Sequence, residues 1–200
     1  MRLLLVLLLT VLFVAACAPP PPALPAGVTA IDPPRAMTAY TLTNTAGESA
    51  SLTDFQGRYV LLVYGYTHCP DICPITLGRF NQIKDLLAEN AAQAVFVFVS
   101  VDPARDTPQR MAEYIGMFDP EIIGLTGEEA TITQMIGEYG GRFSARNFAG
   151  LRENYTVDHT AASFLLNPEG RWIRTYAYGT DSSVIAADML MLMGVAGEEG

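Results

Sequence analysis

Two cysteines four positions apart mark the most chemically distinctive stretch of the chain, YTHCPDICPITLGRF at residues 66–80. A proline follows each cysteine, and His68 directly precedes Cys69. Residues i and i+4 of a helix have Cβ atoms about 5 to 6 Å apart, so Cys69 and Cys73 can bind one metal ion or form a disulfide after modest adjustment. Three residues lie between the cysteines, one more than in the thioredoxin motif, and this wider spacing favours binding of a metal ion between the two sulfurs.

A soft d-block ion that is held in two oxidation states needs a further ligand, and imidazole is the natural one. The chain has two histidines. Neighbouring side chains usually diverge, so we expect His68 to be exposed or to support the site without binding the metal. His159, in TVDHTAASFLLNPEG, is the better candidate. It lies just before a predicted strand, in the position of the loop that packs against the cysteines in thioredoxins. We therefore expect a metal site formed by Cys69, Cys73 and His159.

The elements that must bring these residues together alternate along the chain. Residues 58–66 and 94–102 are apolar runs typical of buried strands, and 163–167 and 171–179 predict a hairpin that turns at Pro168, Glu169 and Gly170. Helices are expected at about 74–89, from Asp106 or Thr107 to Phe118, at 128–139 and at 182–193. Residues 38–53 predict a short hairpin, whereas 140–158 have no clear period and are expected to form a long loop.

This order predicts an α/β, thioredoxin-like fold, with a central mixed β-sheet flanked by helices and an N-terminal β-hairpin. Chemistry in such folds gathers at the carboxyl ends of parallel strands, which is where the cysteine segment lies. If a proline occupies the first helical turn, Cys69 sits at or just before the start of the helix. Exposed N–H groups and the helix dipole would then lower the pKa of its thiol.

The N-terminal residues predict export and anchoring. An apolar run from Leu3 to Ala16 is too short for a comfortable membrane span, and Val14 to Cys17 resembles a bacterial lipobox. We expect a lipoprotein signal at 1–16, a lipid-anchored proline-rich linker at 17–36 that begins at acylated Cys17, one domain at 37–195 and a tail at 196–200. The domain would lie on the extracytoplasmic side of a bacterial membrane; a plain signal peptide with an incidental cysteine is the alternative.

Charge and cysteine content narrow the function classes. The 12 basic side chains are outnumbered by 21 acidic ones, and the resulting net charge of −9 disfavours nucleic-acid binding. Apart from Cys17, only Cys69 and Cys73 remain. A single pair in an exported domain is a structural disulfide, a redox couple or a metal-binding pair.

Three separated segments, GYTHCPDICP, SVDPARDTP and YTVDHTAASFLLNPEG, together strongly resemble the Sco/SenC family of membrane-anchored copper proteins, over about residues 38–190. The resemblance implies that Cys69, Cys73 and His159 bind one copper ion as Cu(I) or Cu(II). It also implies a role in assembling the binuclear copper centre of cytochrome c oxidase, with the copper-binding oxidase subunit as recipient. A periplasmic copper donor and a thiol reductant are further expected partners.

Four aspartates accompany these motifs. Asp71 and Asp158 match the family pattern and are assigned supporting roles, with loop capping as the alternative. Asp102 and Asp106 are interpreted as a strand end and a helix cap, which need no metal.

A second function class remains open, a thiol-disulfide oxidoreductase that uses Cys69 and Cys73 as a redox-active dithiol to keep the oxidase cysteines reduced. Such an enzyme would prefer two intervening residues and a cis-proline loop, whereas this chain has three and places His159 in that loop. A peroxidase of related fold is a third alternative, although its cysteine normally lies in a different signature. The main expectation is a copper chaperone, and one dithiol can serve both delivery and redox chemistry.

Overall fold

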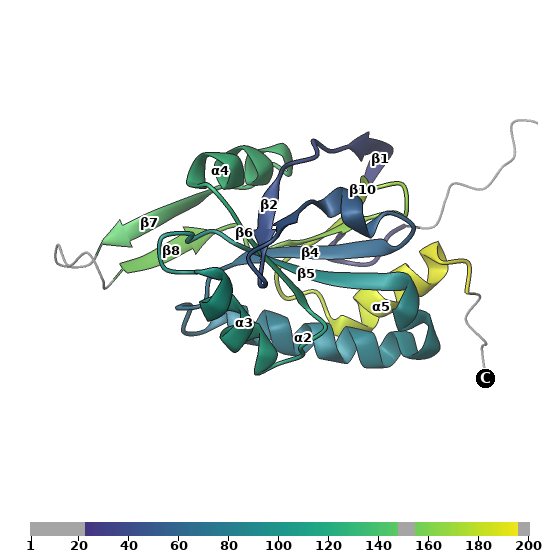
Figure 1. Cartoon of the computed structure of the whole chain (residues 1–200). Helices are drawn as coiled ribbons and strands as arrows, with labels where there is room; N and C mark the ends of the chain where they lie inside the picture. The colour runs from purple at the N-terminus through teal and green to yellow at the C-terminus, as the bar shows by residue number, and fades with distance from the viewer. Residues whose placement is uncertain (1–22, 148–154, 196–200) are drawn as a thin grey trace, which may run out of the picture.

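The computed structural model describes residues 23–147 and 155–195 (Figure 1). Cys17, the expected signal and the expected C-terminal tail lie outside these residues. The described elements, in chain order, are β1 Val28–Ala36, β2 Leu42–Asn44, β3 Ser49–Ala50, the 3-10 helix η1 Leu52–Phe55, β4 Tyr59–Gly65, α2 Ile72–Leu87, the 3-10 helix η2 Ala88–Gln93, β5 Ala94–Ser100, α3 Pro108–Gly116, β6 Ile123–Thr126, α4 Glu129–Glu138, β7 Phe143–Asn147, β8 Tyr155–His159, β9 Ser163–Leu166, β10 Arg171–Tyr176 and α5 Ser182–Leu192.

A mixed sheet of eight strands forms the centre of the molecule, in the order β1-β10-β9-β4-β5-β6-β2-β3. Strands β4, β5 and β6 are parallel, whereas β9 and β10 pair antiparallel beside β4. Helices α2, α3 and α5 lie on one side of this sheet and α4 lies on the other (Figure 1). The predicted thioredoxin-like fold, with a mixed sheet between helices, is confirmed.

Strands β4 and β5 are the two central strands of the sheet, and both have almost entirely apolar sequences. YVLLVYG in β4 and AVFVFVS in β5 are buried along almost their whole length, as expected for parallel strands covered on both faces. Helix α3 starts where its sequence predicts, because the Thr107 side chain accepts a hydrogen bond from the Arg110 N–H and Pro108 occupies the first turn. These elements place the end of β4 and the start of α2 at one edge of the sheet.

Most predicted elements are present, and the ends of the predicted helices and of β4, β5 and β9 agree within two residues. Strand β10 ends at Tyr176, three residues before the predicted end, and the hairpin predicted at 38–53 has strands only at Leu42–Asn44 and Ser49–Ala50. The turn between β2 and β3 includes Gly47, whose φ of +82° suits glycine. Strands β1, β6, β7 and β8 were not identified from sequence. Strand β6 is a four-residue edge of the parallel part, and β1 lies within residues 17–36, which we expected to be linker. Because β1 pairs with β10, the sheet begins before residue 37.

The prediction that residues 140–158 form a loop without regular structure is wrong. Strands β7 and β8 pair there as an antiparallel hairpin, with Phe143 opposite His159. The pattern was missed because the strands form a separate two-stranded sheet in which Val157 is the one buried residue of β8, which is too little apolar alternation to reveal a strand from sequence. Among the residues that the structure describes, no helix is both long and apolar enough to cross a membrane.

Candidate metal centre

The cysteine segment lies at the carboxyl end of β4 and leads into α2. Helix α2 begins at Ile72, so Cys69 precedes the helix and Cys73 is its second residue. The Cys69 Sγ accepts a hydrogen bond from the Cys73 backbone N–H at 3.4 Å. The Asp71 side chain is exposed and makes no capping hydrogen bond, so the Cys69 sulfur rather than a carboxylate meets the free N–H groups of the first turn.

His159, the last residue of β8, is brought to the cysteines from a distant part of the chain. Its Nε2 lies 3.7 Å from the Sγ of Cys73, and its Nδ1 lies 3.1 Å from the carbonyl oxygen of Thr160. A carbonyl oxygen only accepts, so Nδ1 of the neutral ring carries the proton and Nε2 keeps its lone pair. This is the tautomer in which Nε2 can bind a metal ion.

The two thiols are free and differ in burial and in charge preference. A hydrogen bond from Cys73, with smaller contributions from backbone N–H groups, lowers the pKa of Cys69 far below the ordinary thiol value despite partial burial. The same interaction with Cys69, together with burial, raises the pKa of Cys73. The pair therefore loses its first proton as a unit, with the negative charge centred on Cys69 and the remaining proton held at Cys73.

Gly65, the last residue of β4, permits the close approach of the buried Cys73 thiol. A Cβ on Gly65 would lie 2.9 Å from the Cys73 Sγ and 2.5 Å from the ring of Phe98. No side chain fits between these groups, so glycine is required for the packing of Cys73 against the end of the strand. The sequence alone did not identify this residue as part of the site.

A buried carboxylate holds the residues just before Cys69. Asp106 is fully buried and accepts hydrogen bonds from the Thr67 N–H at 3.0 Å, the Thr67 hydroxyl at 2.7 Å and the Ser100 hydroxyl at 2.6 Å. The expectation that Asp106 caps a helix is thus replaced by a longer-range role, since Thr107 is the cap. One possible ligand atom from each of Asp106, Asp102 and His68 lies within 4.8 Å of the others.

His68 contacts the residues around Asp106. The Thr67 hydroxyl donates to Asp106, so it accepts from the His68 Nδ1 at 3.1 Å. The same Nδ1 lies 3.8 Å from Asp106, and 42% of the His68 side chain is exposed. His68 therefore lies at the rim, as expected, whereas His159 lies against Cys73. Asp158 is exposed beside His159.

A model of the family described as SCO1/SenC matches residues 28–194. The chain belongs to the SCO1/SenC family. Protein sco1 of Schizosaccharomyces pombe is 34% identical over 161 residues, which cover 80% of this chain and 61% of that protein. An SCO2-like protein of Rickettsia prowazekii is 33% identical over 137 residues, covering 68% of this chain and 67% of the relative. This SCO1/SenC chain thus spans about two thirds of the length of these relatives.

The structure of Arabidopsis thaliana ScoI with copper bound has a TM-score of 0.73 to this SCO1/SenC chain. It is 30% identical, and the match covers 79% of this chain and 98% of the Arabidopsis chain.

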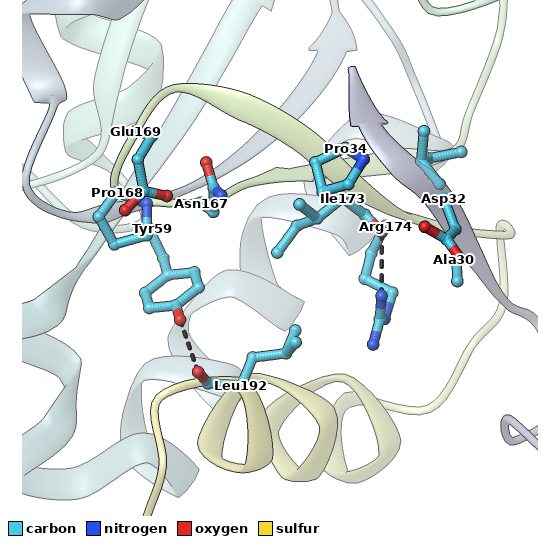
Figure 2. A pocket seen from close by; sticks show the side chains of 11 residues that line it. Ala30, Asp32, Pro34, Tyr59, Asn167, Pro168, Glu169, Ile173, Arg174 and Leu192 are labelled. Atoms are coloured by element: carbon cyan, nitrogen blue, oxygen red, sulfur yellow. Dashed lines mark hydrogen bonds between the residues drawn. The ribbon is translucent and has the colours of Figure 1, made fainter. Parts of the chain in front are cut away.

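A separate cavity of about 460 Å³ lies between β1 and the β9–β10 turn on one side and the end of α5 on the other (Figure 2). Tyr59 donates a hydrogen bond to the Leu192 carbonyl at 2.6 Å on one side, and Arg174 donates to the Ile173 carbonyl at 3.1 Å on the other. Tyr59 is the first residue of β4, whereas the cysteines follow its last residue. Among the described residues, those that line this cavity include no cysteine or histidine.

Proposed function

We propose that this protein binds one copper ion through Cys69, Cys73 and His159 and carries it as cargo. The observation that supports this proposal most directly is the 3.7 Å contact between the Cys73 Sγ and the metal-competent Nε2 of His159. Two sulfurs and one imidazole nitrogen are the donor set that suits copper in both of its oxidation states. The donors therefore fit the ion that the Arabidopsis relative contains.

Each residue has a distinct role in this proposal. Cys69 supplies a ready thiolate, because its lowered pKa keeps it ionised without a metal. Cys73 supplies the second thiolate after losing the proton that it shares with Cys69, which makes copper uptake a proton-releasing step. His159 supplies the nitrogen that Cu(II) requires more strongly than Cu(I) does. Its Nδ1–H bond to Thr160 fixes the ring orientation.

The family membership supports a role as a metallochaperone for the binuclear copper centre of cytochrome c oxidase, with the copper-binding oxidase subunit as the recipient. A copper donor and a thiol reductant would act earlier, since the dithiol must be reduced to accept the ion. We further propose that acylated Cys17 anchors the mature protein to a bacterial membrane and places the domain on the extracytoplasmic side.

One observation favours the alternative function, a thiol-disulfide oxidoreductase for the oxidase cysteines. The lowered pKa of the more exposed thiol, Cys69, is the property of an attacking cysteine, and Cys73 lies where it could resolve a mixed disulfide. The three-residue spacing and the contact between Cys73 and His159 favour copper binding. Both functions use the same reduced dithiol, so they can be steps of one process.

Metal analysis of the reduced protein separates the two functions. The proposal predicts one copper ion per chain after anaerobic loading, followed by transfer of that ion to a metal-free oxidase copper domain whose thiols have already been reduced. A Cys69→Ser, Cys73→Ser double variant is the control and should transfer none. A parallel assay uses the same oxidase domain with its cysteines oxidised; if the wild-type protein transfers no copper to the reduced domain but reduces the disulfide of the oxidised one, the oxidoreductase function replaces the chaperone function.

A further inference from the structure

The hairpin that carries His159 is not part of the main sheet. Strands β7 and β8 pair only with each other, and Figure 1 shows them extending away from the eight-stranded sheet. The pairing of β9 with β4 brings the end of β8 to the same edge of the sheet as the cysteines, but no ladder of the main sheet holds the hairpin itself. Side-chain contacts are left to fix its orientation, and the structure shows a group of them at the start of β8.

Asp102, Arg105 and Tyr155, here called the Arg105 cluster, join the loop after β5 to the first residue of β8. The Arg105 Nε donates to the Asp102 Oδ2, and the Tyr155 hydroxyl donates to the Asp102 Oδ1, each at 2.5 Å. The Arg105 guanidinium also donates to the Tyr155 carbonyl oxygen at 3.1 Å. Its central carbon lies 3.5 Å from the centre of the Tyr155 ring. Arg105 thus holds both the backbone and the side chain of Tyr155.

The Arg105 cluster is largely shielded from water, so the hydrogen bonds between its charged groups are weakly screened. The side chain of Asp102 is 3% exposed and that of Arg105 is 16% exposed. Charge-assisted hydrogen bonds are stronger than neutral ones, and a planar guanidinium can stack on a ring while it donates in its own plane. A lysine ammonium cannot make both contacts at once. The geometry at Tyr155 therefore depends on arginine in particular.

Arg105 also reaches the other end of β8 through Tyr66. The Arg105 guanidinium lies 5.9 Å from the Tyr66 ring centre, and the Tyr66 ring meets the His159 ring edge-to-face at 6.0 Å. From Tyr155 to His159 the extended strand runs about 13 Å. A small rotation of β8 about its start would therefore move the His159 imidazole by more than a ligand bond tolerates.

We propose that Arg105 and Tyr155 are positioning residues that hold His159 beside Cys73 and so set the affinity of the site for Cu(II). This inference rests on the proposed function. Cys69 and Cys73 come from the β4–α2 segment, which the hairpin does not carry, so loss of the Arg105 contacts should leave the two thiolates in place. The affinity for Cu(I) should change little when the cluster is lost, because two thiolates are enough to bind Cu(I). The affinity for Cu(II) should fall, because Cu(II) binding depends on the position of His159.

The test compares Arg105→Lys and Tyr155→Phe with Arg171→Lys, a control for an exposed arginine on β10. Cu(I) and Cu(II) affinities are measured by competition with chelators on fully reduced protein, and near-ultraviolet circular dichroism checks that each variant is folded. We expect Arg105→Lys to weaken Cu(II) binding by about 10- to 100-fold, the usual effect of losing a residue that orients a metal ligand. Cu(I) binding should change by less than about threefold, and Tyr155→Phe should give a smaller Cu(II) loss because its ring still stacks on Arg105.

A second measurement needs no copper. Amide hydrogen exchange in the metal-free protein should be faster in β8 of Arg105→Lys than in the wild type, with α2 and β4 unchanged. Unchanged Cu(II) affinity in Arg105→Lys, or equal losses of Cu(I) and Cu(II), would overturn the positioning role. If the wild-type protein binds no copper, the proposed function fails, and unchanged exchange in β8 would then overturn the positioning role independently.

Discussion

The Sγ of Cys73 and the Nε2 of His159 lie 3.7 Å apart, although 86 residues separate them in the chain. Cys73 is on the helix that follows β4, and His159 ends the hairpin strand that precedes β9. Because β9 pairs with β4, these two segments meet at the same edge of the sheet. The fold therefore brings two sulfurs and an imidazole nitrogen close together.

The lowered pKa of Cys69 predicts unusual reactivity at acid pH. A lowered pKa keeps the thiolate present as pH falls, so iodoacetamide should alkylate Cys69 rapidly even near pH 6, where an ordinary thiol with a pKa of about 8.5 reacts slowly. Cys73 should react slowly because its pKa is raised and its side chain is buried. Mass spectrometry of the labelled peptides reports both rates. Protein unfolded in urea is the control, and equal rates for the two cysteines in the folded protein would contradict this prediction.

Oxidation should remove both thiols together. Cys69 and Cys73 are close enough for the backbone N–H of one to bond the sulfur of the other, so a mild oxidant should form one intramolecular disulfide. Counting alkylatable thiols before and after oxidation should show the loss of two from the domain, and copper uptake should disappear with them. The prediction fails if both thiols stay free, or if the oxidised protein binds copper as before.

Gly65→Ala should disturb the packing of the Cys73 side chain against the end of β4. The added methyl group would collide with Phe98 and with the Cys73 sulfur, and such overpacking costs about 1 to 3 kcal/mol of unfolding free energy. Gly78→Ala is the matched control, because a Cβ at Gly78 in α2 meets no atom within 4 Å and alanine favours a helix by about 1 kcal/mol. Urea unfolding measures both. A Gly65→Ala protein as stable as the wild type, with normal copper binding, would show that the close packing is not needed.

We predict that Cys17, which lies outside the residues that the structure describes, is acylated. The mature protein should begin at Cys17 and carry lipid, which intact mass measurement of the membrane-extracted protein would detect. Cys17→Ser should release or mislocalise it. Firm membrane attachment of a mature protein with an unmodified Cys17 would rule out the lipid anchor.

Sequence predicted those parts of the fold where burial leaves a periodic or continuous apolar pattern. Strands β4 and β5 were evident for this reason, and α3 was marked by Thr107 and Pro108. The β7–β8 hairpin was missed because its polar strands pair only with each other. In the site, residue chemistry alone pointed to Cys69, Cys73 and His159. The roles of Gly65, Asp106 and Arg105 depend on contacts between distant segments, which no local pattern encodes.

The central claim is that His159, and not His68, completes a copper site with the two cysteines. Titration of reduced wild-type, His159→Ala and His68→Ala proteins with Cu(II), followed by visible spectroscopy, tests it most directly. The account predicts a thiolate-to-copper charge-transfer band in the wild type and in His68→Ala that collapses in His159→Ala, while the dithiol of His159→Ala still oxidises and reduces normally. A His159→Ala protein that keeps the band and the Cu(II) affinity but loses disulfide reductase activity would contradict the account and leave the oxidoreductase function in its place.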